Sequence, residues 1–161
     1  MKETARVRQG RIFISNTQRR LRLPAGKIRE LVWFIARSER RAIERIDIAV
    51  VGRRRMASLN ARHLHRRGVT DVLSFDLGIG PAGGLCVQVV VCADVALRQA
   101  RRRGRAAWKE LLLYVAHGLL HAMDYDDGAP RQARRMHEME DRLLEEFGIG
   151  RVFNCQLTTG N

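Results

Sequence analysis

Two histidines and an aspartate have the residue types and the spacing of metal ligands. His117 and His121 are four residues apart, so a helix through them places both imidazoles on one face. Asp127 follows His121 at the interval at which the third ligand follows the second histidine in the extended zinc signature H-E-x-x-H-x-x-G-x-x-H. Histidine nitrogen and carboxylate oxygen both bind zinc, and three protein ligands leave a fourth position for water, as in catalytic sites.

The residues around this spacing favour a buried helix followed by a turn. Asp124 takes the place of the turn glycine, and aspartate is among the few residues that tolerate a left-handed conformation. Imidazole nitrogens on a largely apolar helix need partners, and a shared metal ion provides one for each. The sequence therefore predicts a metal site on a buried helix and the turn after it. Much of the rest of that helix's circumference is covered by Leu111, Leu112, Val115, Leu119, Leu120 and Met123.

Two simpler interpretations of the same residues remain open. The histidines could each be hydrogen-bonded in the core without a metal, because polar groups inside proteins usually find such partners. The aspartate-rich segment from Asp124 to Asp127 could be a turn that only ends the helix.

The residue after the first histidine separates two reaction classes. A zinc peptidase of the HExxH type has a glutamate there as general base, whereas this chain has Gly118. The missing carboxylate argues against ordinary proteolysis. Zinc can also lower the pKa of a water toward about 7 or polarise a phosphoryl oxygen, and neither role requires that glutamate.

The elements that must position these residues follow from hydrophobic periodicity and from the turn residues between segments. Strands and helices are predicted in the order β-α-β-α-β-β-α-α-α, with a glycine-rich, hairpin-like connection over residues 76–84. This order predicts an α+β fold, layered as in α/β proteins, with a small mixed sheet and helices packed on it in a single domain. The predicted strands are residues 11–15, 46–51, 72–75 and 85–92, and the predicted helices begin near residues 24, 53, 94, 108 and 130.

Composition indicates a cytoplasmic protein of one domain, residues 1–161, with loose termini at 1–10 and 149–161. The 45% hydrophobic content is enough for a core at this length, and no apolar run approaches the length of a membrane span. The N-terminal residues lack the apolar region of a signal peptide. The chain has three cysteines without CxxC spacing, which indicates free thiols rather than disulfides or metal ligands.

The charge of the chain favours a polyanionic partner. Thirty basic residues against seventeen acidic ones give a formal net charge of +13, and nearly all the positive charge is arginine. Many of these arginines could instead only solvate the surface, and those near residue 103 also suit a helix C-terminus. The arginines predicted to contact RNA are Arg62, Arg66, Arg67, Arg101, Arg102, Arg103 and Arg105.

The sequence resembles one known family in two motifs that occur in the same order. HGLLHAMDYDD, residues 117–127, is similar to the H-G-x-x-H-x-x-G-Y-D-H signature of the YbeY family, which comprises bacterial endoribonucleases that mature ribosomal RNA. TDVLSF, residues 70–75, matches a strand of that family, and the Leu59–Asn60 pair precedes it at the family's distance. Residues 92–96 also fall where the family has a strand running into a helix, so the resemblance covers roughly residues 45–147.

The resemblance implies a zinc-dependent, single-strand-specific endoribonuclease. Its implied roles are maturation of the 3′ end of small-subunit ribosomal RNA and ribosome quality control, with that RNA and the small ribosomal subunit as partners. It further implies that His117, His121 and Asp127 bind one zinc ion per chain and act in catalysis through it. Asp126, adjacent to a ligand, is predicted to orient a histidine as a supporting carboxylate.

The sequence departs from the family pattern at several positions. Asp127 replaces the third histidine, and Asp124 replaces the signature glycine. Val87–Gln88 stands where the family commonly has a Gly-Asp pair, and Leu64 falls at the position of an arginine thought to act in catalysis. Either arginine of the Arg66–Arg67 pair could substitute from nearby.

Two rival functions use the same ligand spacing. A zinc metallopeptidase is compatible with the ligands but lacks the expected glutamate. A non-catalytic ribosome-binding zinc protein is compatible with the charge, but a structural zinc is normally held by four protein ligands.

Overall fold

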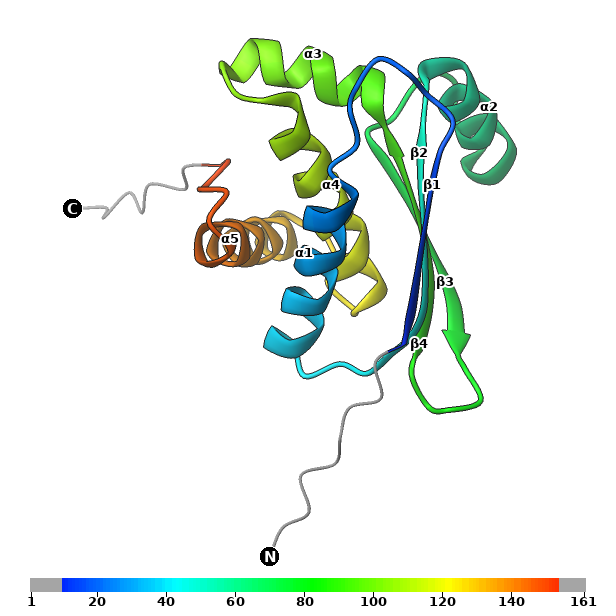
Figure 1. Ribbon diagram of the computed structural model, residues 1–161, viewed down its shortest axis with the longest axis vertical. Coiled ribbons are helices and arrows are strands. Elements are labelled where there is room, and N and C mark those ends of the chain that lie inside the picture. Colours follow the sequence, from blue (N-terminus) through cyan, green and yellow to red (C-terminus); the bar gives the residue numbers. More distant parts are fainter. Residues whose placement is uncertain (1–9, 154–161) are drawn as a thin grey trace, which may run out of the picture.

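A computed structural model describes residues 10–153 of the chain, and its elements follow the predicted order of strands and helices (Figure 1). The strands are β1 (Arg11–Asn16), β2 (Ile43–Val51), β3 (Val72–Ile79) and β4 (Leu85–Cys92), and the helices are α1 (Ala25–Ser38), α2 (Arg53–Leu64), α3 (Ala93–Arg103), α4 (Ala107–Ala122) and α5 (Pro130–Phe147).

The four strands form one mixed sheet in the order β1-β2-β4-β3. β1, β2 and β4 are parallel, and β3 pairs with β4 antiparallel. β4 lies inside the sheet, and its sequence is accordingly the most continuously apolar of the four strands. The fold is therefore α+β, with a small mixed sheet, as predicted.

Three of the strands are longer than predicted: β1 extends by one residue to Asn16, β2 begins at Ile43 rather than at residue 46, and β3 continues past residue 75. Residues 76–79 were assigned to the glycine-rich connection, but they continue the strand to Ile79, which pairs with Leu85. A register irregularity between Asp76 and Ile79 accommodates Gly78, whose φ is +88°. The glycines therefore mark an irregular strand end as well as a turn, a distinction that composition does not make.

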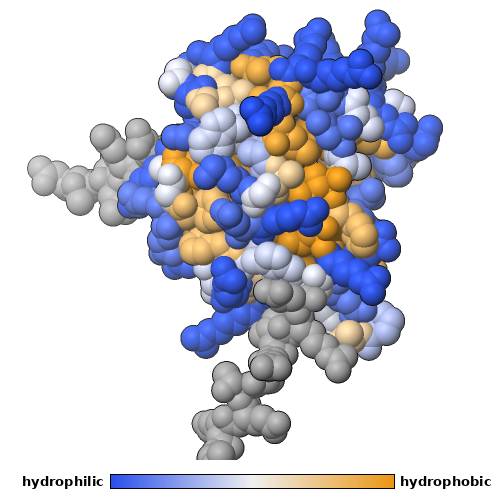
Figure 2. Space-filling model, in the orientation of Figure 1, coloured by the Kyte–Doolittle hydropathy of each residue, from blue (hydrophilic) through white to orange (hydrophobic). Residues whose placement is uncertain are grey.

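The helices cover the two faces of the sheet unequally. α1, α4 and α5 lie on one side of it, whereas α2 lies on the other side near one end (Figure 1). Burial alternates accordingly along β2: Ile46, Ile48 and Val50 are buried, and Asp47 and Ala49 are partly exposed. In the space-filling view, apolar surface gathers where edge strand β1 crosses the molecule, with hydrophilic surface around it (Figure 2).

α4 is the central helix of the packed layer. It packs on β3 and β4 and contacts α1 and α5, and nearly all of its circumference is buried, as its sequence predicts. Even Glu110 in its first turn has no exposed surface. Arg103 and Arg105, at and just beyond the end of α3, pair with that carboxylate at 3.0 and 3.7 Å. The α3–α4 corner is thus held by a buried charge with two cationic partners.

α4 makes its closest approach to the sheet at Gly118. A Cβ added at this position would lie 2.7 Å from a Val89 methyl carbon and 3.1 Å from one of Val72. The Ser74 hydroxyl, in β3, donates a hydrogen bond of 2.6 Å to the Gly118 carbonyl. The residue directly after His117 therefore faces the sheet, and only glycine fits there without displacing a strand side chain.

The C-terminal end of the described range packs against α5. Ile149 is buried, and the backbone N–H groups of Val152 and Phe153 both donate to Asp141 of α5, at 2.7 and 3.0 Å. The rest of the terminal segments predicted to be loose, residues 1–9 and 154–161, lies outside the described residues. Within the part of the chain that the structure describes, no helix is both long and apolar enough to cross a membrane.

The Gly118→Ala variant should lower the free energy of unfolding by about 1–3 kcal/mol, the usual effect of forcing a carbon into a packed core. Gly26→Ala is the matched control, because a Cβ there meets nothing within 4 Å and alanine favours a helix over glycine. Urea denaturation of both variants measures the difference. If Gly118→Ala is as stable as Gly26→Ala, the contact with Val89 does not limit this position.

Candidate metal centre

Three donor atoms from one helix and the turn after it converge on a common point. The Nε2 atoms of His117 and His121 are 3.0 Å apart. The nearer carboxylate oxygen of Asp127 lies 3.7 Å from the first of these nitrogens and 3.5 Å from the second. The three side chains thus form a group that could hold a metal ion, and the predicted ligands are the ones that the fold brings together.

The size of this triangle fits zinc. Ligands about 2.0–2.2 Å from a tetrahedral zinc lie roughly 3.3–3.6 Å from one another. The three separations of 3.0, 3.5 and 3.7 Å bracket that range. The donor set, two imidazoles and one carboxylate, is also one that zinc accepts.

The other nitrogen of each histidine is already engaged. His121 Nδ1 donates to the backbone carbonyl of Tyr125 at 3.0 Å, and His117 Nδ1 donates to the carboxylate of Glu140. With protons on both Nδ1 atoms, both neutral rings direct the lone pairs of Nε2 at each other. Two facing lone pairs repel unless a cation or a proton lies between them. The hydrogen bonds therefore prepare these two nitrogens for a metal.

Glu140 is a site residue that the sequence-based interpretation missed. It lies in α5, has no exposed surface, and its Oε2 lacks a hydrogen-bond partner among the described residues. Burial is the largest single influence on the pKa of His117 and lowers it, but the hydrogen bond and charge of Glu140, with Asp71 and Asp127, raise that pKa overall. Glu140 thus stabilises positive charge at His117, whether a proton or a metal carries it.

The turn that supplies Asp127 has the predicted geometry. Asp124 adopts a left-handed conformation with φ +73°, at the place where the zinc signature has glycine. Its carboxylate pairs with Arg41 at 3.3 Å, and the Tyr125 hydroxyl donates to Glu39 at 2.8 Å. The turn is therefore attached to the end of α1, which fixes the path of the chain to Asp127.

Asp126 has a different role from the one predicted. Its carboxylate accepts a hydrogen bond of 3.0 Å from the backbone N–H of Gly128 and so shapes the turn. The histidine-orienting contacts belong instead to Glu140 and to the Tyr125 carbonyl. Proximity in sequence to a ligand was the reason for choosing Asp126, but its position in the turn directs its carboxylate to its own backbone.

The metal group opens onto a polar cleft of about 440 Å³. His117 and Asp127 lie in its wall, and the exposed fractions of their side chains are 19% and 44%. Arg98 and Arg103 of α3 line the same cleft, together with the partly buried Asp71. The cleft therefore combines a set of metal ligands with cationic side chains that could bind an anionic ligand.

The arginines predicted to contact RNA fall into two groups. Those of the first group are exposed at and after the end of α2: Arg62, Arg66 and Arg67. The second group is at and beyond the end of α3, where Gly104 ends the helix with φ +62°, as predicted: Arg101, Arg102, Arg103 and Arg105. In this second group, Arg103 both lines the cleft and pairs with Glu110, and the half-buried Arg105 also pairs with Glu110. Arg98, one turn earlier on α3, is a cleft residue that the sequence-based interpretation did not select.

The second motif, residues 70–75 with the preceding Leu59–Asn60 pair, contributes Asp71 to the wall of the cleft. Asn60 is buried, and its side-chain amide donates to the Gly68 carbonyl at 3.1 Å, which ties α2 to the following loop. Asp71 accepts the backbone N–H of Val72 at 2.9 Å at the start of β3. Leu64 stands at the position of the family arginine and is 47% exposed. At this position the chain therefore presents an apolar side chain to solvent instead of a charged one.

Comparison with known proteins identifies the class. The sequence model of a family described as Endoribonuclease YbeY matches residues 13–148. Proteins named Endoribonuclease YbeY include one from Anaeromyxobacter sp. (strain Fw109-5), 44% identical over 110 residues, which are 68% of this chain and 57% of that protein. Another, from Kineococcus radiotolerans, is 36% identical over 126 residues, 72% of this chain and 73% of that protein.

A solved structure shares the fold. The solution structure of TM1509 from Thermotoga maritima is 20% identical in sequence and matches with a TM-score of 0.56 over 85% of this chain and 91% of that one. Fold and site together define a small α+β protein with a two-histidine, one-aspartate group at the end of a buried helix. The chain belongs to the YbeY family, which confirms the resemblance of its motifs. It spans little more than half the length of the Anaeromyxobacter relative.

Glu140→Gln should lower zinc affinity by about 10- to 100-fold, because glutamine keeps an acceptor for His117 but removes the charge that increases the basicity of that ligand. Glu138→Gln, on the exposed surface of the same helix, is the matched control and should bind zinc as the unmodified protein does. Competition with a chromophoric chelator measures both affinities. Equal affinities for the two variants would remove Glu140 from the site.

Proposed function

We propose that this protein is a zinc-dependent endoribonuclease that cleaves single-stranded RNA. The observation that carries the proposal is the convergence of His117, His121 and Asp127 beside a cleft whose wall includes His117, Asp127 and two arginines. The names of the related proteins support the choice of RNA as substrate. A zinc ion bound there would supply a Lewis acid next to the scissile phosphate.

The side chains of the cleft have separate tasks in this proposal. His117, His121 and Asp127 hold the metal, while Glu140 and the Tyr125 carbonyl keep the two imidazoles in the binding tautomer. Arg98 and Arg103 bind the phosphate next to the metal, where a guanidinium offsets its negative charge. Because Arg103 also pairs with the buried Glu110, its head group is held in place before RNA arrives.

The packing of α4 argues against the peptidase alternative more strongly than the missing side chain alone. The position that carries the general base in HExxH peptidases is Gly118, and here it faces Val89 and Val72 of the sheet. A glutamate at this position would point into the core rather than toward a water in the cleft. Both the residue type and the direction of the position therefore disfavour peptide hydrolysis.

We also propose a finer biological role, for which membership of the same family is the support. We place the protein in maturation of the 3′ end of small-subunit ribosomal RNA and in ribosome quality control, with that RNA and the small subunit as partners and the cytoplasm as its location. The net charge of +13 supports a partner rich in phosphate. These roles rest on family membership and charge.

Purified protein should contain about one zinc per chain and cleave single-stranded RNA but not casein, because the ligands describe one site without the peptidase base. His121→Ala should remove both zinc and cleavage, and Asp127→Ala most of both. Asp127→His should retain both, since histidine is the family's commoner third ligand. His137→Ala is the control for zinc content only, because His137 lines the same cleft but stacks on Phe153 and is outside the ligand group. Elemental analysis and parallel assays, with zinc removed and restored, provide the measurements.

Several results would contradict this assignment. Full zinc in His121→Ala would reject the ligands, and unchanged zinc in Asp127→Ala would place the third ligand elsewhere. Zinc-loaded protein that binds RNA without cleaving it would favour the non-catalytic ribosome-binding protein. Cleavage of casein would favour the peptidase.

RNA affinity should fall steeply with salt, because each neutralised phosphate releases a counterion. With four to six contacts, the log–log slope should be roughly −3 to −4, at about 0.7 per contact for single strands. Changing Arg66 and Arg67 together to alanine should make the slope shallower by about one to two units and leave zinc content unchanged. Fluorescence anisotropy with a labelled strand measures it. A slope near zero would mean that the arginines do not bind the RNA backbone.

A further inference from the structure

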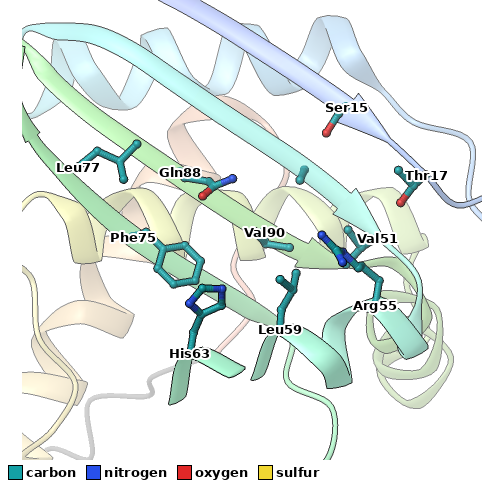
Figure 3. Close-up of a pocket in the computed structure, with 11 residues that line it drawn as sticks. Ser15, Thr17, Val51, Arg55, Leu59, His63, Phe75, Leu77, Gln88 and Val90 are labelled. Atoms are coloured by element: carbon teal, nitrogen blue, oxygen red, sulfur yellow. The ribbon is translucent and has the colours of Figure 1, made fainter. Parts of the chain in front are cut away.

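A second groove lies on the face of the sheet that α1, α4 and α5 leave open. It has a volume of about 730 Å³ and is bounded by the four strands and by α2 (Figure 3). Its floor is apolar, with Phe75 and Val90 among the strand residues that form it. Phe13 and Leu77, on the same face, are 46% and 55% exposed, which is unusual for side chains of this size.

The rim of this groove is strongly basic. Arg55 of α2 points over the groove from the rim (Figure 3). The segment from Arg53 to Arg67 contains six arginines and two histidines and no acidic residue, and all six arginines are exposed. Asp47, a carboxylate on this face near the groove, is paired with Arg45 at 2.9 Å. An occupant of the groove therefore meets uncompensated positive charge.

The groove also presents flat rings and small polar groups. The ring of His63 lies edge-on to that of Phe75, with centroids 5.1 Å apart (Figure 3). Gln88, Ser15 and Thr17 place an amide and two hydroxyls at the same surface. Aromatic faces stack on bases, amides and hydroxyls can bond base edges, and arginines bind phosphates. This combination matches a single strand of RNA better than it matches an apolar peptide.

We propose that this groove binds the single-stranded RNA substrate at a distance from the metal, with a base on Phe75 and the backbone along the arginines of α2. The inference rests on the proposed function and adds a second binding surface to it. Arg55 contacts a phosphate, and Phe75 with His63 holds one base against the sheet.

The groove and the metal cleft are connected by one short, basic stretch of chain. His63 lines the groove, and Val69 lines the cleft. Six residues of chain span at most about 22 Å, a distance that roughly six stacked nucleotides cover. Arg66 and Arg67 are exposed within this stretch. A single strand that runs along this stretch from the groove to the candidate ligands meets Arg66 and Arg67 on its way.

Binding to a 2′-O-methyl RNA of about 15 nucleotides tests the groove without depending on cleavage. In the zinc-loaded protein, Phe75→Leu should weaken binding about five-fold or more, the effect of losing one stacked base, and leave the salt dependence unchanged. Phe75→Tyr, which keeps the ring, should bind as the unmodified protein does. Arg55→Gln should weaken binding and make the salt slope shallower by about 0.7. Arg37→Gln, exposed on α1 behind the sheet, is the matched control and should change neither quantity.

Crosslinking locates the strand directly. An RNA that carries 5-iodouracil should crosslink to the peptides that contain His63 or Phe75. Crosslinks confined to α3 and α5 would overturn the proposal, and so would equal losses of affinity in Phe75→Leu and Phe75→Tyr. A wild-type dimer that Leu77→Asp dissociates would show that a second copy of the chain covers the groove instead. Failure of the zinc-loaded protein to cleave any RNA would reject the proposed function but would leave this binding result standing.

Discussion

The close contact between α4 and the sheet at Gly118 sets the geometry on which the metal group depends. Because Gly118 has no side chain, α4 lies close enough to the sheet for the Gly118 carbonyl to accept a hydrogen bond from the Ser74 hydroxyl. His117 and His121 are rotated about 60–100° around the helix from Gly118, so fixing one face against the sheet fixes the direction of both imidazoles. In the last two turns of α4, His117 and His121 keep partial exposure while the residues between them are buried, and His117 lies in the wall of the cleft. A shift of the helix outward would move the two nitrogens away from Asp127, which the turn attaches separately to α1.

The features of the fold and site that could be predicted from the sequence are those that depend on residues close together in the chain. The order of the elements, the burial of α4, the left-handed Asp124 and the glycine stop of α3 are local in sequence, and each was predicted correctly. Glu140 was not, although it falls on the same face of α5 as Met136 and Leu143. A charged residue on an apolar stripe indicates a buried partner, but periodicity cannot name a histidine 23 residues away.

The open sheet face was missed for a related reason. Alternation along a strand shows that two faces differ, but not which of them a helix will cover. Phe75 was predicted only as part of a motif strand, and the sheet directs its ring to the face that α2 covers at one end only. Arg98 was not predicted, because it stands apart in sequence from the run of arginines at the end of α3 and only the fold brings it to the cleft. The α3–α4 corner sets how far the arginines of α3 lie from the candidate metal ligands. Glu110, which is buried within that corner, has no local sequence signature.

The three donor atoms come from eleven consecutive residues, whereas Glu140 comes from another helix. A ligand stabilises a fold only by its preference for the folded over the unfolded chain. Residues so close in sequence close a small loop at little entropic cost, so an unfolded chain would keep part of its affinity for an ion that these residues bind. The folded-state preference of an ion bound there would therefore come mainly from α5 and from the turn's attachment to α1. Such an ion would discriminate weakly between folded and unfolded forms of α4 and its turn, and strongly between docked and undocked forms of α5.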